Sequence, residues 1–240
     1  MRLTFHGHAC VSLTGAGSRI VLDPGTLARS AEALDGATAV LITHEHADHL
    51  DVAAVVAALR ADDALTVRGT AGAVEALLHA GAAGERLHAV EPVEELQLGA
   101  ALVRVGGGDH ALIHSRAPRV ANRTYTVTLE GATVHHPGDS FDVPTEALDV
   151  LCLPVSGPWL RLTEAIDATL AASARTVVPV HDAMLSETGH ELTRRWLDTA
   201  RLGGEHVYRR LGAGVQSSGS RGSSTRSAIL VSRERPRHSS

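Results

Sequence analysis

The chain has 240 residues, which suits a single α/β domain, and 44% of them are hydrophobic. Its formal net charge is −5, and because residues 213–240 carry five arginines against one glutamate, the remainder is more acidic still. An acidic body argues against nucleic-acid binding, and no apolar run reaches transmembrane length, so neither a nucleic acid nor a membrane is expected as a partner.

Two features indicate the compartment. The N-terminus lacks the uninterrupted apolar stretch of a secretion signal, since His6, Gly7 and His8 interrupt it. Cys10 and Cys152 lie in apolar runs at no metal-binding spacing, which is typical of reduced core cysteines. We therefore expect a soluble, cytoplasmic protein.

The first half of the chain begins with strands and continues with helices. Apolar runs predict strands at residues 3–5, 10–13, 19–22 and 39–42, with a turn at Asp23-Pro24-Gly25. Apolar residues at helical spacing predict helices over residues 51–60 and 71–80.

The second half mixes the two element types. Strands are predicted at residues 102–105, 125–129, 133–135, 150–153 and 176–180, with a tight turn at 106–108 and a hairpin turn at 130–131. Helices are predicted over 164–173 and over 190–202, the latter burying Leu192, Trp196 and Ala200. This order indicates sheets covered by helices rather than a simple alternating parallel fold.

The chain divides into a domain at residues 1–212 and a tail at 213–240. The tail is rich in Ser, Gly and Arg, so it buries too little apolar surface to offset its ordering entropy, and disorder is expected. Its apolar patch, residues 228–231, could dock as a short strand.

Residues 43–49 hold four metal-binding side chains, His44, His46, Asp48 and His49. In extended backbone, His44 and His46 point to the same side and form a pair of nitrogen ligands. A solvated His-rich loop is the alternative, but an apolar strand directly precedes the segment and an apolar helix follows it. The four ligands begin two adjacent metal sites without completing them.

Further polar residues follow other apolar strands. Asp109-His110, the segment from His135 to Ser140, and His181-Asp182 each come where a strand ends. Ligands at strand ends are what a site at one edge of a sheet requires.

Taken together, these motifs resemble the metallo-β-lactamase superfamily, in particular the branch that includes ascorbate-6-phosphate lactonase. The resemblance covers roughly residues 1–205 and leaves out the tail. Beyond His44-x-His46-x-Asp48-His49, it is carried by Gly7-His8-Ala9, Leu22-Asp23-Pro24, Asp109-His110, His136-Pro137-Gly138-Asp139 and Pro179-Val180-His181-Asp182.

The resemblance implies a four-layer αββα sandwich with a dinuclear centre at one edge of the two sheets. His44, His46 and His110 would bind the first ion, Asp48, His49 and His181 the second, and Asp139 would bridge them. Asp48, His49 and Asp139 would take the most direct part in catalysis, which uses a hydroxide shared by two divalent ions. Zn is favoured as the metal, and Mn or Fe is also compatible with these donors.

Four further residues are candidates for supporting roles. His114 competes with His110 as a ligand, and His110 is favoured because it follows the glycine turn that would bring the backbone close to the site. His8 is expected to approach the site, and Asp23 to orient a ligand imidazole. Trp159 lines either the substrate pocket or the core.

The function predicted is hydrolysis of a small intracellular substrate, with a lactone or a phosphorylated sugar ester favoured. A metal-dependent phosphodiesterase or nuclease is the first alternative, supported only by the arginines of the tail. A non-catalytic metal-binding module is the second, although such sites usually need only four ligands. A homo-oligomer is possible.

Overall fold

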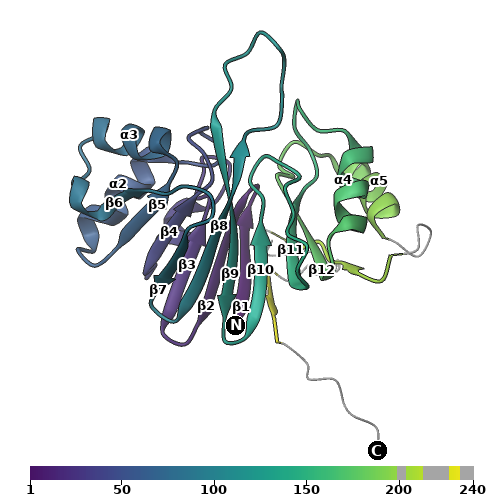
Figure 1. Cartoon of the computed structure of the whole chain (residues 1–240), viewed down its shortest axis with the longest axis horizontal. Coiled ribbons are helices and arrows are strands. Elements are labelled where there is room, and N and C mark those ends of the chain that lie inside the picture. The colour runs from purple at the N-terminus through teal and green to yellow at the C-terminus, as the bar shows by residue number, and fades with distance from the viewer. Residues whose placement is uncertain (199–203, 213–226, 233–240) are drawn as a thin grey trace, which may run out of the picture.

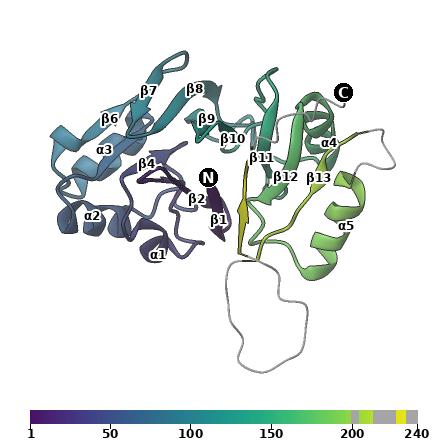
Figure 2. The ribbon, with the colours of Figure 1, turned by 90° about the horizontal axis from the view of Figure 1, so that it is seen from below.

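The computed structural model describes residues 1–198, 204–212 and 227–232. Two seven-stranded sheets pack face to face, with helices on both outer sides (Figures 1 and 2). In spatial order the first sheet contains β14 (Ala228–Leu230), β1 (Arg2–Gly7), β2 (Cys10–Gly15), β3 (Ser18–Leu22), β4 (Ala39–Ile42), β5 (Thr66–Gly69) and β6 (Leu87–Ala89). The second contains β13 (Val207–Tyr208), β12 (Ala174–Val180), β11 (Leu148–Pro154), β10 (Ala132–His136), β9 (Ala121–Leu129), β8 (Ala101–Asp109) and β7 (Glu95–Leu98).

Helices cover the outer face of each sheet. Helices α1 (Ser30–Leu34), α2 (Val52–Ala61) and α3 (Ala71–His79) flank the first, and α4 (Leu162–Ala171) and α5 (Glu187–Leu197) flank the second, with a 3₁₀ turn η1 at Gly84–Arg86. The predicted αββα sandwich is therefore confirmed. Among the helices of the described ranges, none has the length and apolar character needed to cross a bilayer.

The largest apolar cluster fills the space between the sheets. It is built mainly of Leu, Val, Ile and Ala from β1–β4 and from β8–β12, with Tyr125 as its largest fully buried member. The Tyr125 hydroxyl crosses the interface and donates to the carbonyl of Ile42 at 2.9 Å. A buried phenol needs such a partner, and here the bond ties β9 to the end of β4.

Local chemistry explains where several elements begin. The side chains of Asp51, Thr70 and Ser186 accept backbone N–H bonds at the first turns of α2, α3 and α5. Glu130 and Gly131 both have positive φ, 52° and 76°, which is the geometry of the predicted two-residue hairpin turn between β9 and β10.

Two expectations about elements were wrong, the turn at residues 106–108 and the bounds and buried face of the helix predicted over 190–202. Residues 106–108 are not a turn, because β8 continues to Asp109 and pairs with β9 throughout; glycines in a strand can mark a close backbone approach. Helix α5 starts at Glu187 and buries His190, Thr193 and Leu197, whereas Leu192 and Trp196 are 53% and 46% exposed. Ala200 lies outside the described residues.

The tail contains more structure than was expected. Strand β14 pairs antiparallel with β1, joining Leu3 to Ile229, so residues 228–230 belong to the first sheet. The predicted docking of the 228–231 patch is confirmed. The other tail residues, 213–226 and 233–240, lie outside the described ranges.

Candidate metal centre

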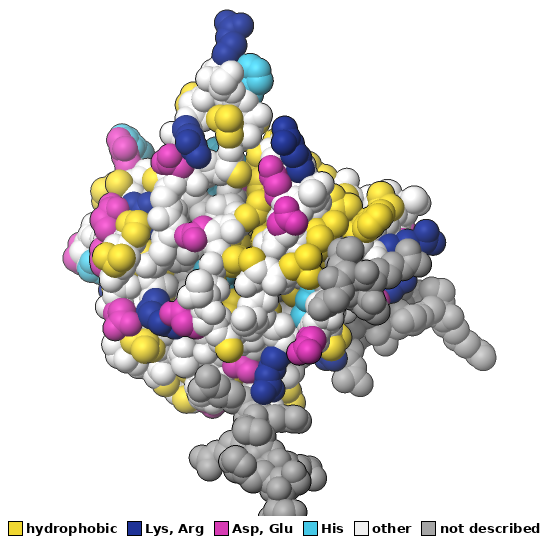
Figure 3. All heavy atoms as spheres, turned by 45° about the vertical axis from the view of Figure 1, so that its right-hand side comes forward, with side chains coloured by type: hydrophobic (Ala, Val, Ile, Leu, Met, Phe, Trp, Pro, Cys, Tyr) yellow, Lys and Arg dark blue, Asp and Glu magenta, His cyan; other side chains and the backbone are white. Residues whose placement is uncertain are grey.

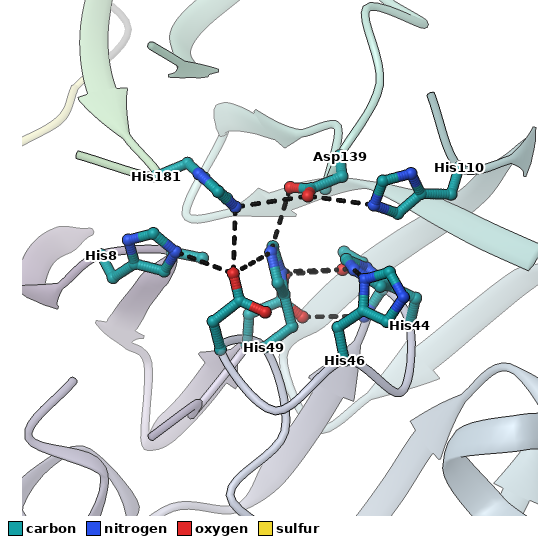
Figure 4. Close-up of polar contacts among 12 residues, drawn as sticks. His8, His44, His46, His49, His110, Asp139 and His181 are labelled. Atoms are coloured by element: carbon teal, nitrogen blue, oxygen red, sulfur yellow. Dashed lines mark hydrogen bonds and ion pairs between the residues drawn. The ribbon is translucent and has the colours of Figure 1, made fainter. Parts of the chain in front are cut away.

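The predicted ligands meet at one edge of the two sheets (Figure 4). Strands β8, β10 and β12 run in the same direction, since β8 and β10 are each antiparallel to β9 and β10–β11–β12 are parallel. Their carboxyl ends therefore lie at one edge of the second sheet, where they face the carboxyl end of β4 in the first sheet. His44, His46, Asp48 and His49 follow β4, and His110, Asp139 and His181 follow β8, β10 and β12.

The ligand segment after β4 is held by the turn after β3. Thr26 donates its backbone N–H to the carbonyl of Ala47 at 2.8 Å, and Asp51 donates to the carbonyl of Pro24 at 2.8 Å. A Cβ on Gly25 would lie 1.8 Å from the carbonyl oxygen of Asp48, so only glycine permits this contact. The Asp23-Pro24-Gly25 turn thus packs against the backbone of the ligand segment and fixes its position.

The first donor set consists of His44, His46 and His110, whose ligand atoms all lie within 4.8 Å of one another. Nε2 of His44 is 3.0 Å from Nδ1 of His46. His114 instead lies exposed on the loop and accepts the backbone N–H of Arg116. The structure thus places His110, and not His114, beside His44 and His46, and the role of His110 as a metal ligand stays a prediction.

The second set consists of Asp48, His49 and His181, joined by His8. Oδ2 of Asp48 lies 3.1 Å from Nε2 of His8 and 3.2 Å from Nε2 of His181. His8 was expected to approach the site, and it does.

Asp139 stands between the two sets. Its Oδ2 is 3.1 Å from Nε2 of His110 and 3.3 Å from Nε2 of His181, and its Oδ1 is 3.0 Å from Nε2 of His49. One carboxylate therefore faces histidines of both sets, which is the position that a bridging ligand needs.

Asp23 orients ligands of both sets. It is fully buried, and its Oδ2 accepts hydrogen bonds from Nδ1 of His49 and from the Thr43 hydroxyl, each at 2.7 Å. Because that hydroxyl gives its proton to Asp23, it accepts one from Nδ1 of His44 at 3.0 Å. Both rings thus carry a proton on Nδ1 and turn Nε2, the nitrogen that would bind a cation once deprotonated, toward the site.

His8 differs from the other histidines in its tautomer. Its Nδ1 accepts the backbone N–H of Ala183 at 3.3 Å, so Nε2 carries the proton and donates to Asp48. His8 thus presents an N–H to the site and orients Asp48. His8, Asp23 and His181 all have left-handed backbone, with φ of 51°, 47° and 55°, and such strain gathers at functional sites.

Two supporting residues were missed by the sequence reasoning. Thr43 links Asp23 to His44 as described, and Asn122, fully buried on β9, accepts the backbone N–H of Asp139 at 3.1 Å and donates to the carbonyl of Pro137. Thr43 could have been found from the sequence, because it is a polar residue between a buried strand and His44. Nothing local to the sequence marks Asn122.

Charges in the cluster are strongly coupled. Burial opposes the charged form of His181, but contacts with the Asp139 and Asp48 carboxylates outweigh it and raise the pKa of His181 to about 9. Burial likewise opposes a charge on His49, yet the negative charges of Asp139 and Asp23 raise its pKa well above the ordinary value. Burial would raise the pKa of Asp139, and the neighbouring histidines instead lower it well below its usual range.

The donor set fits a cation. Nε2 of His49, Oδ1 of Asp139 and Nε2 of His181 are buried, and within the described ranges they lie at ion-pair distance from one another or from Asp48, but none of them makes a hydrogen bond. Leaving such atoms unsatisfied is costly, and a divalent ion among them would satisfy all three. Imidazole nitrogen with carboxylate oxygen is a donor set for Zn, Mn or Fe.

Metal affinity is expected to rise with pH. His181 has a raised pKa, so without metal it holds a proton below about pH 9, and this charge stabilises the metal-free fold fully below about pH 6.5 and less as pH rises through 9. A cation must displace that proton and the one on His49, so apparent affinity should increase about tenfold per pH unit for each displaced proton. Calorimetric titration between about pH 6.5 and 8.5, in buffers of different ionisation enthalpy, checks this. A pH-independent affinity without proton release would contradict it.

Comparison with known proteins agrees with this geometry. Residues 2–181 match the family described as "Beta-lactamase superfamily domain". Protein Rv0786c of Mycobacterium tuberculosis is 36% identical over 188 residues, which cover 78% of this chain and 86% of that protein. A UPF0173 metal-dependent hydrolase of Natranaerobius thermophilus is 28% identical over 193 residues, covering 75% of this chain and 83% of that protein. The metallo-β-lactamase fold protein YhfI of Bacillus subtilis has a TM-score of 0.69 at 16% identity, covering 89% of this chain and 97% of that one.

The family match spans most of the chain, and the chain therefore belongs to the β-lactamase superfamily, with the metallo-β-lactamase fold. Within that superfamily, the His/Asp donor set and the relatives place it among the metal-dependent hydrolases.

Proposed function

We propose that this protein hydrolyses a small molecule, a lactone or a phosphorylated sugar ester, with two divalent metal ions, Zn first and Mn or Fe as further candidates. The observation that supports it best is Asp139, which lies within 3.3 Å of one histidine of the first donor set and one of the second. A structural metal site is usually closed by four ligands, whereas seven donor side chains meet here.

When bound, two such ions would lower the pKa of a coordinated water and so supply a nucleophile near neutral pH. The protein's own part is to orient and to balance charge. Asp48 and Asp139 offset the cations' charge, while the Asp23–Thr43 pair holds two imidazoles with Nε2 toward the site. His8 holds Asp48 through Nε2–H.

The surroundings of the centre support a small substrate with an anionic part. The loop between β8 and β9, residues 110–120, rises above the sheets (Figure 1). A small hollow beside His46 and His110 is lined by Leu112, Ile113 and Arg119. Arg119 is half-exposed there, and Figure 3 shows cationic and histidine side chains near the tip of this loop. A lactone or sugar ester carrying a phosphate matches this mixture, and the Gly7-His8-Ala9 motif of the ascorbate-6-phosphate lactonase branch points the same way.

A test of the function begins with elemental analysis of protein purified without added metal. A panel of lactones and phosphodiesters is then assayed in the metal found. We expect two ions per chain, hydrolysis of a lactone or phosphate-bearing ester, and strong loss of that activity in His46→Ala and Asp139→Ala made separately. Absence of stoichiometric metal from the wild type, or full activity in both variants, would refute the proposal.

The phosphodiesterase or nuclease alternative depends on the arginines of residues 213–240. Because Ala228–Leu230 pairs with β1, deleting the whole tail would also remove a strand. Exchanging its five arginines for Ser is the cleaner experiment. Unchanged, negligible RNA binding would dispose of the alternative.

We also propose that the protein works in the cytoplasm on a small-molecule substrate, without a nucleic-acid or membrane partner and with a homo-oligomer possible. Cys10 and Cys152 are both buried and free, which suits a reducing compartment. Cell fractionation and light scattering test location and oligomeric state.

A further inference from the structure

Trp159 contacts the carboxylate that stands between the two donor sets. Its indole Nε1–H donates to Oδ2 of Asp139 at 2.9 Å, and the side chain is buried, with 7% of the residue exposed. The same oxygen is the one nearest to Nε2 of His110 and Nε2 of His181. The indole therefore holds the oxygen that both donor sets share.

The indole ring also lies beside one histidine of each set. Its centroid is 6.0 Å from that of His110 and 6.1 Å from that of His181, with both rings close to edge-on. Phe141 packs against Trp159 at 5.5 Å. The ring is thus fixed by packing while its N–H faces the cluster.

The segment that carries Trp159 is shaped to place it there. Gly157 has a φ of +146°, and a Cβ on it would lie 2.9 Å from Nε1 of Trp159, so a larger residue would push the indole aside. The Ser156 hydroxyl donates to the carbonyl of His181. One short segment after β11 therefore braces both the His181 backbone and the Asp139 side chain.

The hydrogen bond matters because a carboxylate can rotate. Asp139 reaches His49 with Oδ1 and the other histidines with Oδ2, and a rotation would break both relations. A buried indole N–H needs an acceptor, so it resists that rotation. Outer partners of metal ligands typically contribute about 10–100-fold to metal affinity.

We propose that Trp159 is a positioning residue that couples the two metal sites by locking the Asp139 carboxylate in its bridging orientation. This inference rests on the proposed two-metal function. Without the hydrogen bond from Trp159 to Asp139, the two ions bind in separate steps, and the more weakly bound ion is held less tightly.

The experiment compares Trp159→Phe with wild type. The metal-free form of each protein is titrated with Zn²⁺ to measure affinity, and with Co²⁺ because bound Co²⁺ has a visible spectrum. Phe keeps a ring to pack on Phe141 but lacks the N–H. We expect the weaker ion to bind about 10–100-fold less tightly, with an altered Co²⁺ spectrum, while the thermal midpoint of the metal-free protein changes little. Gly157→Ala, which keeps the tryptophan and displaces its indole, should give the same loss of affinity.

Trp196→Phe is the matched control, because Trp196 is 46% exposed on α5 and is the other tryptophan of the chain. It should bind both ions as wild type does, and in this background metal should change the fluorescence of Trp159. Wild-type affinities and spectrum in both Trp159→Phe and Gly157→Ala would overturn the inference while leaving the proposed function intact. A wild type that binds only one ion would overturn both.

Discussion

Asp139→Asn is expected to reduce hydrolytic activity by more than about 100-fold, above the cost typical of losing only an outer partner of a ligand. The carboxylate lies within 3.3 Å of Nε2 atoms on His49, His110 and His181, and an amide there is neutral and turns an N–H₂ group toward at least one of them. Metal content should fall together with activity. Elemental analysis and assay of the same preparation measure both quantities.

Asp109→Asn makes the same chemical change beside the ligand His110, but its side chain is 61% exposed and pairs with Arg119. It should keep wild-type metal content and nearly full activity. An Asp139→Asn protein that retains two ions and full activity would show that Asp139 does not bridge. Loss of metal and of activity in both variants would instead indicate that the substitutions disturb the loop after β8.

Much of the centre could be predicted from the sequence because its ligands follow apolar strands. Val40, Leu41 and Ile42 are fully buried, so the polar residues after them must lie at a sheet edge. Parallel directions of β10 and β12 then bring Asp139 and His181 to that edge. The pairing of the two donor sets was implied by the family resemblance rather than by spacing, and the geometry agrees with it.

Other features depend on tertiary contacts that no local pattern records. Apolar Leu192 and Trp196 suggested the buried face of α5, yet the helix packs through His190 and Thr193, which lie on a different side. Strands β5, β6 and β7 have three or four residues each and were missed, since so short a run shows little periodicity. Asn122 was also missed, because it reaches Asp139 only through the pairing of the neighbouring strands β9 and β10.

Asp23→Asn should weaken binding of the second ion by about 100-fold, the upper end of the range for an outer partner, although Asp23 is not itself a proposed ligand. Asp23 accepts three hydrogen bonds, from the backbone N–H and hydroxyl of Thr43 and from Nδ1 of His49. An amide cannot accept all three. If its nitrogen faces His49, the ring must move its proton to Nε2, the atom that would bind the cation.

The reverse orientation of the amide would leave the backbone N–H of Thr43 without an acceptor, at a cost of about 1–3 kcal/mol in folding free energy. Metal titration together with denaturant unfolding of the metal-free protein separates these two outcomes. Thr43→Val is the matched control, because it removes the link to His44 but leaves the bond between His49 and Asp23. It should weaken the first ion more than the second, and Asp23→Asn the second more than the first. Equal effects of the two variants on both ions would mean that Asp23 supports the whole ligand segment and does not set the tautomer of His49.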